Sequence, residues 1–486
     1  MNIKLICNSI GKLCYLSAAC LLLSTLVELH YPPRDFPYWF LLPAALALAL
    51  GILLCRVRPN EQNLYARDGI AAVVFGWLVI TLLGALPFLL SRVCDSFIDS
   101  FFESISGFST TGASILRDVE SLTKGLLFWR SFSQWLGGLG FLALMSAFSS
   151  SVKAQTIYVL QSEITGPTLE KFVPKIENTI KILYAIYVIL TLGSVLALTF
   201  CRMPLFDAVL NSFGAVATGG FSINNAGIAE YNSLTVEIVL TVIMLASGVN
   251  FTLYYMFVTH SKRAVVKDEE LHFYLGTFAV LTIAIAICLH MQGVFESFGE
   301  SLRRSAFHVS SIITTAGYTS YDYNLWPLFP KALLLLLMFF GGSAGSTSGG
   351  IKHVRILLLF KLVRREVGRL THPRSAHVVT LNGKAVDNKV LHAVGVYFFL
   401  LISLFFGAFI LISFDTNDFT TAFSAVAACI NSIGPGFNAV GPSGNYADFS
   451  SLSKVVFIAC MFIGRLEIYP IVVLFTPSFW RRSGLR

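Results

Sequence analysis

Apolar stretches of about twenty residues recur from one end of this chain to the other, and a helix of that length can cross a lipid bilayer. Of the 486 residues, 55% are hydrophobic and only 13% are charged. A soluble domain has about 25% charged residues, so most of this chain cannot face water. We therefore expect one multi-pass membrane protein, held in a lipid bilayer, rather than a string of soluble domains.

The net charge of +8 fits this class, because the cytoplasmic loops of membrane proteins are rich in Lys and Arg. The basic residues are scattered among apolar segments instead of forming one patch, so we expect no nucleic-acid partner. The nine cysteines contain no C-x-x-C pair and lie mostly in apolar runs. They are typical of small buried residues rather than of a disulfide framework or a metal site.

Two apolar runs, 10–29 and 38–55, open the chain. A longer pattern then recurs about every hundred residues, as internal repeats do. Each unit has an apolar run, a shorter semi-apolar stretch, a Gly/Thr/Ser-rich turn and a second apolar run. In chain order these segments are 70–90, 96–107, 109–114 and 126–148; 180–200, 205–216, 217–222 and 235–258; 273–290, 301–313, 314–319 and 331–360; and 392–414, 419–430, 431–437 and 455–475.

The middle stretch of each unit has about 11 to 13 residues, too few to cross a bilayer. We interpret these stretches as re-entrant helices, which enter the membrane and turn back within it. The predicted fold is an all-α membrane protein with four pseudo-symmetric repeats of helix, re-entrant pore helix and helix around a central pore, plus two N-terminal transmembrane helices. The predicted boundaries are 1–60 for the N-terminal pair and 61–150, 151–262, 263–374 and 375–486 for repeats one to four.

The distribution of charge predicts the orientation, provided that the re-entrant stretches do not cross the bilayer. One side then carries the basic residues Arg56, Arg58, Arg67, Lys153, Lys171, Lys175, Lys262, Arg263, Lys267, Lys352, Arg355, Lys361, Arg364, Arg365, Arg369, Arg481, Arg482 and Arg486. The other carries the acidic residues Asp95, Asp99, Glu103, Asp118, Asp207, Glu230, Glu296, Asp322, Asp415 and Asp418. The basic side is the cytoplasm, with both termini and ten spans, and the acidic side is a mouth that attracts cations.

The four turns read Ser109-Thr110-Thr111-Gly112-Ala113, Ala217-Thr218-Gly219-Gly220-Phe221, Thr314-Thr315-Ala316-Gly317-Tyr318 and Asn431-Ser432-Ile433-Gly434-Pro435-Gly436-Phe437. Irregular backbone at membrane depth persists only where it is buried in protein or lines a water-filled path. Carbonyls held in line can replace the water shell of a potassium ion, and glycine allows the left-handed dihedral angles that aim them inward. One such turn is equally consistent with an ordinary loop between helices, but four in register indicate an ion path.

These turns resemble the four filter loops of the Trk/Ktr/HKT superfamily of potassium transporters, most closely those of the TrkH and TrkG membrane subunits of bacterial Trk systems. The resemblance rests on segments 106–113, 219–222, 314–318 and 431–436, and it covers nearly the whole chain, including the two N-terminal helices. It implies a potassium-binding filter made of Thr110, Thr111, Gly112, Ala113, Ala217, Thr218, Gly219, Gly220, Thr314, Thr315, Ala316, Gly317, Asn431, Ser432, Ile433 and Gly434.

The resemblance also implies a homodimer in the bacterial inner membrane and a cytosolic TrkA-type regulatory subunit that binds NAD(H) or ATP/ADP. Potassium is then the ion bound by this chain, and the nucleotide belongs to the partner, with no organic cofactor here. Members that favour sodium carry Ser in place of the first filter glycine, so Gly112 favours potassium. Thr218 stands where TrkH and TrkG usually have an apolar residue, which leaves open whether Gly219 or Gly220 is the second filter glycine.

A Gly/Ser-rich run at 341–350 interrupts the second apolar run of the third unit, and such a run is a poor helix former. Gly345 and Gly350 have the spacing of a phosphate-binding P-loop, but Ile351 replaces its Lys and no soluble strand precedes it. One alternative is a close-packing kink between helices. The other, which the resemblance implies, is a mobile gate below the filter formed by Gly345, Ser346, Thr347, Ser348 and Gly349.

Arg465 lies inside the last apolar run, where a charge is costly and by default functional. The resemblance makes it part of the gate, where its charge raises a barrier to cations. The alternative is an ion pair, with Glu467 or another acid, that holds helices together. Arg130 lies near an outer membrane end and is expected to snorkel to the surface, and the Gly-Gly-Leu-Gly segment 137–140 is expected to be a small-residue packing face.

These observations favour a potassium channel or channel-like uptake protein and disfavour an enzyme. A symporter that couples potassium to protons or sodium would have the same sequence features. An intramembrane enzyme would need a nucleophile–base pair or a metal cluster, whereas His290, His308 and His392 are isolated. The basic segment 352–374, directly after the proposed gate, is expected to help dock the regulatory subunit.

Overall fold

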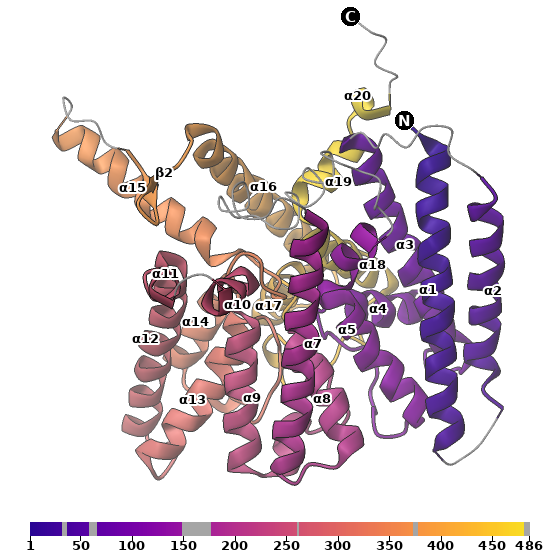
Figure 1. The fold of residues 1–486 in the computed structure, drawn as a ribbon. Helices are drawn as coiled ribbons and strands as arrows, with labels where there is room; N and C mark the ends of the chain where they lie inside the picture. The colour runs from indigo at the N-terminus through magenta and orange to yellow at the C-terminus, as the bar shows by residue number, and fades with distance from the viewer. Residues whose placement is uncertain (32–35, 58–65, 148–175, 260–261, 373–377, 481–486) are drawn as a thin grey trace, which may run out of the picture.

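The computed structural model describes residues 1–31, 36–57, 66–147, 176–259, 262–372 and 378–480 (Figure 1). The expected boundaries at 60–61, 150–151 and 374–375 lie outside these residues. So do several basic residues on which the predicted orientation depends, namely Arg58, Lys153, Lys171, Lys175, Arg481, Arg482 and Arg486.

The described chain is helical apart from one short hairpin. Strands β1 (Thr380–Leu381) and β2 (Lys384–Ala385) pair in antiparallel fashion, which the all-α prediction did not include. The two N-terminal helices are α1 (Ile3–His30) and α2 (Tyr38–Cys55), and α1 packs against α2, α3 and α5. In Figure 1, α1, α2, α7, α9 and α12 stand roughly parallel to one another.

The same order of elements then occurs four times along the chain. The first set is α3 (Ala66–Leu90), α4 (Phe97–Phe108) and α5 (Lys124–Ala147). The second is α7 (Ile176–Phe200), α8 (Leu205–Ala217), α9 (Leu234–Ser247), α10 (Phe251–Thr259) and α11 (Lys262–Val266). The third is α12 (Glu269–Met291), α13 (Phe298–Ile313), α14 (Leu328–Leu337) and α15 (His353–Thr371). The fourth is α16 (Asn388–Ile412), α17 (Phe419–Ile430), α18 (Ser451–Leu466), α19 (Ile468–Leu474) and α20 (Pro477–Trp480).

The four short helices α4, α8, α13 and α17 begin within a few residues of the predicted stretches. Side-chain caps fix three of these starts, because Ser96, Ser297 and Asp418 each accept a hydrogen bond from a backbone N–H in the first turn of the helix. The fourth helix, α8, begins directly after Pro204. Proline has no backbone N–H and its ring clashes with a preceding helical turn, so the helix cannot extend to earlier residues. Most residues of these helices are buried, so the core of the molecule surrounds them.

Six helices among the described residues are long and apolar enough to span a membrane, or up to eight if each of two bent pairs counts as one span. The bent pairs correct the prediction of straight second spans at 235–258 and 455–475. The helices α9 and α10 meet at 86°, and α18 and α19 meet at 113°. At the second bend Glu467 has φ +62, a left-handed conformation that ends the α-helix there.

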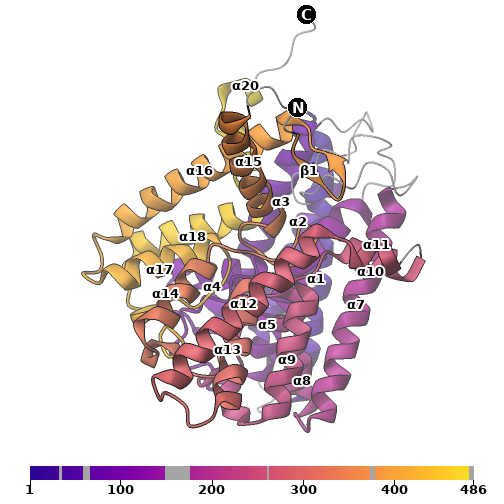
Figure 2. The same ribbon diagram turned by 90° about the vertical axis from the view of Figure 1, so that its left-hand side faces the viewer.

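The second span of the third set is also interrupted. Helix α14 has only 10 residues, segment 338–352 is irregular, and α15 follows. The basic segment after the proposed gate is therefore a helix over most of its length. Helix α15 rises at the same end of the molecule at which α1 begins and α20 lies (Figures 1 and 2).

Candidate functional site

The four turns that follow α4, α8, α13 and α17 have one backbone conformation. The residue after the helix cap, or the cap itself, has a left-handed φ: Thr110 (+54), Thr218 (+55), Thr315 (+57) and Ser432 (+55). Two residues later stands a glycine with φ between +64 and +93: Gly112, Gly220, Gly317 and Gly434. In the second turn the glycine at this place is Gly220, and Gly219 occupies the place of Thr111, Ala316 and Ile433.

One backbone hydrogen bond fixes each turn. The N–H of the residue between the two left-handed positions donates to the carbonyl oxygen five residues earlier in the short helix. The pairs are Thr111 to Ser106 (2.9 Å), Gly219 to Gly214 (2.8 Å), Ala316 to Ser311 (2.8 Å) and Ile433 to Ala428 (2.9 Å). This bond caps the helix end and gives all four turns the same path away from it.

The turns meet one another in a closed cycle. A Cβ atom added to Gly112 would overlap with the Gly219 oxygen of the second turn, and one added to Gly220 would overlap with the Ala316 oxygen of the third. In the same way Gly317 faces the Ile433 oxygen of the fourth turn, and Gly434 faces the Thr111 oxygen of the first. Each turn therefore packs its glycine against a carbonyl of the next, and the fourth returns to the first.

Hydroxyl oxygens lie at the first left-handed position of each turn. Among the described residues, no hydrogen-bond partner is present for the buried hydroxyls of Thr110 and Ser432. The hydroxyl of Thr315 accepts from the Gly349 N–H (2.7 Å), and that of Thr218 donates to the Ala217 oxygen (2.6 Å). Buried hydroxyls without a partner are costly, and a bound cation would satisfy their lone pairs.

An open cavity of about 170 Å³ lies beside the cycle of turns, and all four left-handed glycines line it. Its wall also includes Arg117, Arg130, Asn225 and Asn445, and the loops that follow the turns supply most of it. Asp118 is exposed in one of these loops. The Asn225 amide donates to the Asp118 carboxylate (2.8 Å) and lowers its pKa, which keeps the negative charge at neutral pH.

Glu103 does not contribute to the acidic mouth that we predicted, and Arg130 does not snorkel. Both side chains are buried, and they form an ion pair of 2.7 Å. Arg130 also donates to the Ser222 oxygen (2.9 Å) and stacks on Phe221 at 4.1 Å from the ring centroid. A buried charge needs such a set of partners, and this set joins α4 and α5 to the chain that leaves the second turn.

A similar ion pair supports the third turn. Arg304 on α13 donates to Glu237 on α9 (2.8 Å) and to the Ser320 oxygen (2.7 Å), just after Tyr318. The other acidic residues of the predicted mouth, which include Asp95, Asp322 and Asp415, are at least partly exposed. The negative charge of the mouth therefore comes from the loops and from the first turns of α4 and α8, where Asp99 and Asp207 are half-buried.

The irregular segment 338–352 lies against the turns. The Thr347 hydroxyl donates to the Val216 oxygen at the end of α8 (2.9 Å), and Gly349 donates to Thr315 as described above. A Cβ atom on Gly349 would lie 2.6 Å from the Ser432 side chain. Segment 338–352 thus contacts the third and fourth turns directly, and it contacts the end of the helix that precedes the second turn. The predicted gate residues 345–349 and the predicted filter residues are therefore neighbours.

Arg465 joins this group from α18. It donates to the carbonyl oxygen of Thr347 (3.0 Å), and close hydrogen bonds link it to the Gly137 and Gly138 oxygens on α5. Glu467, the partner considered from the sequence, forms an ion pair with Arg355 on α15 instead (2.7 Å). Gly137 also packs directly against the Phe108 backbone, as a small-residue packing face should.

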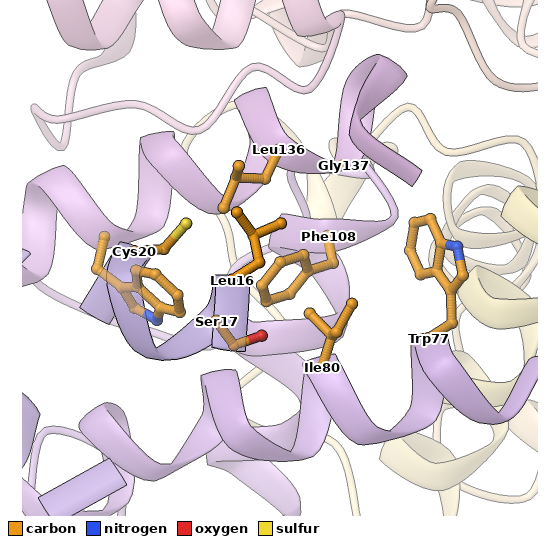
Figure 3. Close-up of a pocket in the computed structure, with 9 residues that line it drawn as sticks. Leu16, Ser17, Cys20, Trp77, Ile80, Phe108, Leu136 and Gly137 are labelled. Atoms are coloured by element: carbon orange, nitrogen blue, oxygen red, sulfur yellow. The ribbon is translucent and has the colours of Figure 1, made fainter. Parts of the chain in front are cut away.

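Close behind the first turn lies a small cavity of about 30 Å³ (Figure 3). Figure 3 shows that apolar side chains from α1, α3, α4 and α5 surround it, among them Leu16, Trp77, Phe108 and Leu136. Carbon atoms cannot replace the water shell of an ion. This cavity is therefore a packing defect beside the site and not part of an ion path.

The sequence reasoning did not assign Glu103, Arg130 or Gln134 to the site. Arg130 and Gln134 lie four residues apart, which places them on one face of α5. A buried arginine and a glutamine on the same face of an apolar helix are a signal of polar partners inside the membrane. Their partners, however, come from the second turn, about 90 residues later, and no local pattern indicates that pairing.

Helices of this length and composition, arranged around four irregular turns at their centre, define a multi-pass membrane transport protein. Residues 43–482 match the family described as TrkH, cation transport protein, and the chain belongs to this family. It is thus a transporter of the bacterial inner membrane and not an enzyme.

Individual relatives match over the full length. The chain is 36% identical to the Trk system potassium uptake protein TrkH of Salmonella typhimurium, over 99% of this chain and 100% of that protein. It is 34% identical to the Trk system potassium uptake protein TrkG of Escherichia coli, over 99% of each. The crystal structure of the potassium transporter TrkH from Vibrio parahaemolyticus superposes with a TM-score of 0.89 at 34% identity, covering 99% of this chain and 100% of that one.

Proposed function

We propose that the protein is a potassium-selective pore and that the four turns are its selectivity filter, arranged with pseudo-fourfold symmetry around the pore axis. The observation that carries the proposal is the closed cycle of turns, in which left-handed glycines and neighbouring carbonyls alternate. Such a cycle offers oxygen atoms from four directions, as the dehydration of a potassium ion requires. The names of the relatives, which are potassium uptake proteins, support potassium as the transported ion.

The filter then consists of the residues predicted from the sequence, with Gly112, Gly220, Gly317 and Gly434 as equivalent positions. Backbone carbonyls supply most of the oxygens, and the unpartnered hydroxyls of Thr110 and Ser432 supply others. Potassium is the cargo that passes through, not a resident cofactor. The exposed acidic side chains of the mouth raise its local concentration.

Segment 345–349 and Arg465 form the gate below the filter. The Gly349 N–H donates to the Thr315 hydroxyl and takes up one of the two lone pairs that this oxygen could offer to an ion. Arg465 holds Thr347 and adds a positive charge in a region of low dielectric, where it repels a cation strongly. The block is therefore both steric and electrostatic.

The orientation and the partners complete the proposal. Helix α15 and both ends of the described chain lie at one end of the molecule, which we assign to the cytoplasm. A cytosolic nucleotide-binding subunit of the TrkA type docks there and moves segment 345–349 through α15. Two copies of the chain form a homodimer.

The test is potassium uptake in a bacterial strain that lacks its own uptake systems, with and without a TrkA-type partner, followed by flux in liposomes. Uptake that supports growth at low potassium is expected, and its absence in a correctly inserted protein would overturn the proposal. The reversal potential of the liposome current identifies the mechanism. A value set by the potassium gradient alone indicates a channel, and a shift with the proton or sodium gradient indicates a symporter.

A further inference from the structure

The contacts between neighbouring turns are held by buried polar side chains, and three of the four involve tyrosines. The Tyr318 hydroxyl donates to the Asn211 oxygen (3.0 Å), which links the third turn to α8. The Tyr323 hydroxyl donates to the Gly436 oxygen (2.8 Å), which links the third turn to the fourth. Tyr446 donates its hydroxyl to Gly434 (2.9 Å) and its N–H to Ser114 (3.0 Å), which links the fourth turn to the first.

The contact between the first and second turns is held differently, by Gln134 on α5. Its amide nitrogen donates to the Gly219 oxygen (2.7 Å), and its amide oxygen accepts from the Phe221 N–H (3.1 Å). The Gln134 side chain has no solvent exposure. Both polar ends of the amide are therefore satisfied by the backbone of one turn, on either side of Gly220.

The absence of a side chain at Gly219 leaves room for this amide. A Cβ atom at Gly219 would lie 2.6 Å from Cδ of Gln134, so any larger residue would push the amide away. The Gly219 oxygen is also the atom that faces Gly112 across the contact between the turns. A single side chain outside the filter thus holds the carbonyl at which the first and second turns meet.

This carbonyl is unlike its three equivalents. Within the part of the chain that the structure describes, Gly219 is the one residue of the set Thr111, Gly219, Ala316 and Ile433 whose oxygen accepts a side-chain hydrogen bond. An amide donor has two effects on a carbonyl. It restricts rotation of the peptide plane, and the positive hydrogen of the donor offsets part of the negative field that the oxygen presents to a cation.

We propose that Gln134 is a positioning residue that sets the ion selectivity of the pore by holding the Gly219 carbonyl; this inference rests on the proposed function. A held carbonyl cannot move inward to fit the smaller sodium ion, and an oxygen with a weaker field favours the larger ion. The two accounts of filter selectivity, by cavity size and by field strength, therefore predict the same direction. Without the amide, the permeability of the pore to sodium is expected to rise relative to its permeability to potassium.

The test uses Gln134→Met, which keeps the length of the side chain and removes both hydrogen bonds. Discrimination of potassium over sodium, measured as a permeability ratio in liposomes, is expected to fall by about tenfold, as the loss of hydrogen bonds to a buried carbonyl would give. The matched control is Thr191→Val, which removes the hydrogen bond from Trp135 on the same turn of α5 (3.0 Å) without touching the filter. Its permeability ratio is expected to equal that of the unmodified protein.

A second variant tests the same contact from the other side. In Gly219→Ala the new methyl group displaces the Gln134 amide, so the same loss of discrimination is expected. If Gln134 acts through this carbonyl, the double variant shows no more loss than either single one. Additive losses in the double variant, or an unchanged ratio in Gln134→Met, would overturn the inference. If Gln134→Met fails to insert, an unchanged ratio in Gly219→Ala overturns it alone.

The unmodified protein and Gly112→Ser are measured in the same experiment and separate the two proposals. If the unmodified protein does not prefer potassium, the proposed function fails. If it prefers potassium and Gly112→Ser loses that preference while Gln134→Met keeps it, the pore stands and the role of Gln134 is wrong. A purely structural role for Gln134 would lower the melting temperature and leave the permeability ratio unchanged.

Discussion

Four glycines stand where neighbouring turns meet, and each meets a carbonyl oxygen where a side chain would otherwise lie. Their left-handed φ values add a second reason for glycine, because other L-residues are strained there. Steric fit and backbone conformation thus select the same residue type at Gly112, Gly220, Gly317 and Gly434. At this scale a methyl group is already a large change.

Gly112→Ser tests that conclusion directly. The serine Cβ would overlap with the Gly219 oxygen, so one carbonyl must turn away. We expect the potassium-to-sodium permeability ratio to fall by about tenfold or more, which corresponds to about 1.4 kcal/mol of lost discrimination. Permeability ratios that match those of the unmodified protein would remove Gly112 from the filter.

The buried ion pair of Glu103 and Arg130 gives a prediction about stability. Removing one partner leaves a buried charge alone, which costs about 3–5 kcal/mol. We expect Glu103→Gln and Arg130→Met each to lower the melting temperature in detergent strongly, and the double variant to lower it less than the sum. Single variants that melt like the unmodified protein would show that the pair does not support the fold.

Residue roles were predictable where the signal is local. Gly and Thr clusters at regular spacing indicated the turns, because those residue types are needed at each position by itself. The roles of Arg130 and Gln134 depend on atoms of Ser222 and Gly219, which only the fold brings near. The choice between Gly219 and Gly220 likewise required the backbone angles, because two adjacent glycines leave no difference in side chain.

At the scale of elements, the interruption between α14 and α15 contains the proposed gate. Segment 345–349 is held by a few hydrogen bonds to the ends of α8 and α13 and by Arg465 on α18. The carboxylate of Glu270 on α12 accepts from Ala344 (2.7 Å) and Val354 (3.1 Å), on either side of the segment. The segment is therefore fastened at its ends, and further hydrogen bonds at Gly345, Thr347 and Gly349 hold its middle in this conformation.

Deleting 346–348, or changing Arg465→Ala, removes the contacts at the middle. We expect partner-independent potassium flux per folded protein to rise by about tenfold for each loss of about 1.4 kcal/mol from the closed state. Flux in liposomes is the measurement, and Ser403→Ala on an exposed face of α16 is the control for insertion. Well-folded variants with unchanged flux would contradict the gate, and variants that unfold instead would favour a structural role for Arg465.

The elements themselves were largely predictable, because apolar runs and short capped stretches are local patterns. The bends were predictable only in part. Pro470 is a local signal for a helix break after Leu466, but no neighbouring residue indicates the left-handed backbone of Glu467 itself. Its conformation is stabilised by Arg355 on α15, which lies more than 100 residues earlier in the chain. The bend of 86° after Ser247 had a local signal in Gly248, which the apolar pattern concealed.

At the scale of the whole molecule, the basic helix α15 follows the proposed gate in the chain and is the proposed docking element for the regulatory subunit. The structure narrows the residues available for docking. Lys352 and Arg355 are buried, and Arg355 is engaged with Glu467, whereas Arg364 and Arg369 are exposed. If the proposed partner docks on this helix, we expect the far part to contact it and the near part to transmit movement to segment 345–349.

Replacing Arg364 and Arg369 with glutamine is expected to weaken capture of a TrkA-type partner by about tenfold while insertion remains normal, because each exposed charge contributes to a charge-dependent interface. Capture from solution by the immobilised protein is the measurement. Glutamine at Arg92 and Arg117, which are exposed in loops after α3 and after the first turn, changes the net charge equally and serves as the control. If both double variants lose the same amount of partner capture, the effect is due to net charge and not to docking on α15.

The cycle of turns has a consequence for how such a filter diverges. The four turns are encoded by four separate stretches of one gene, so a change in one codon alters only one turn, which is one quarter of the cycle. A channel built from four copies of a chain must accept every change four times over. Here Thr111, Gly219, Ala316 and Ile433 occupy one level of the cycle with four different side-chain sizes. The side chain at this level can therefore differ from one quarter to the next, whereas the position that follows is glycine in all four.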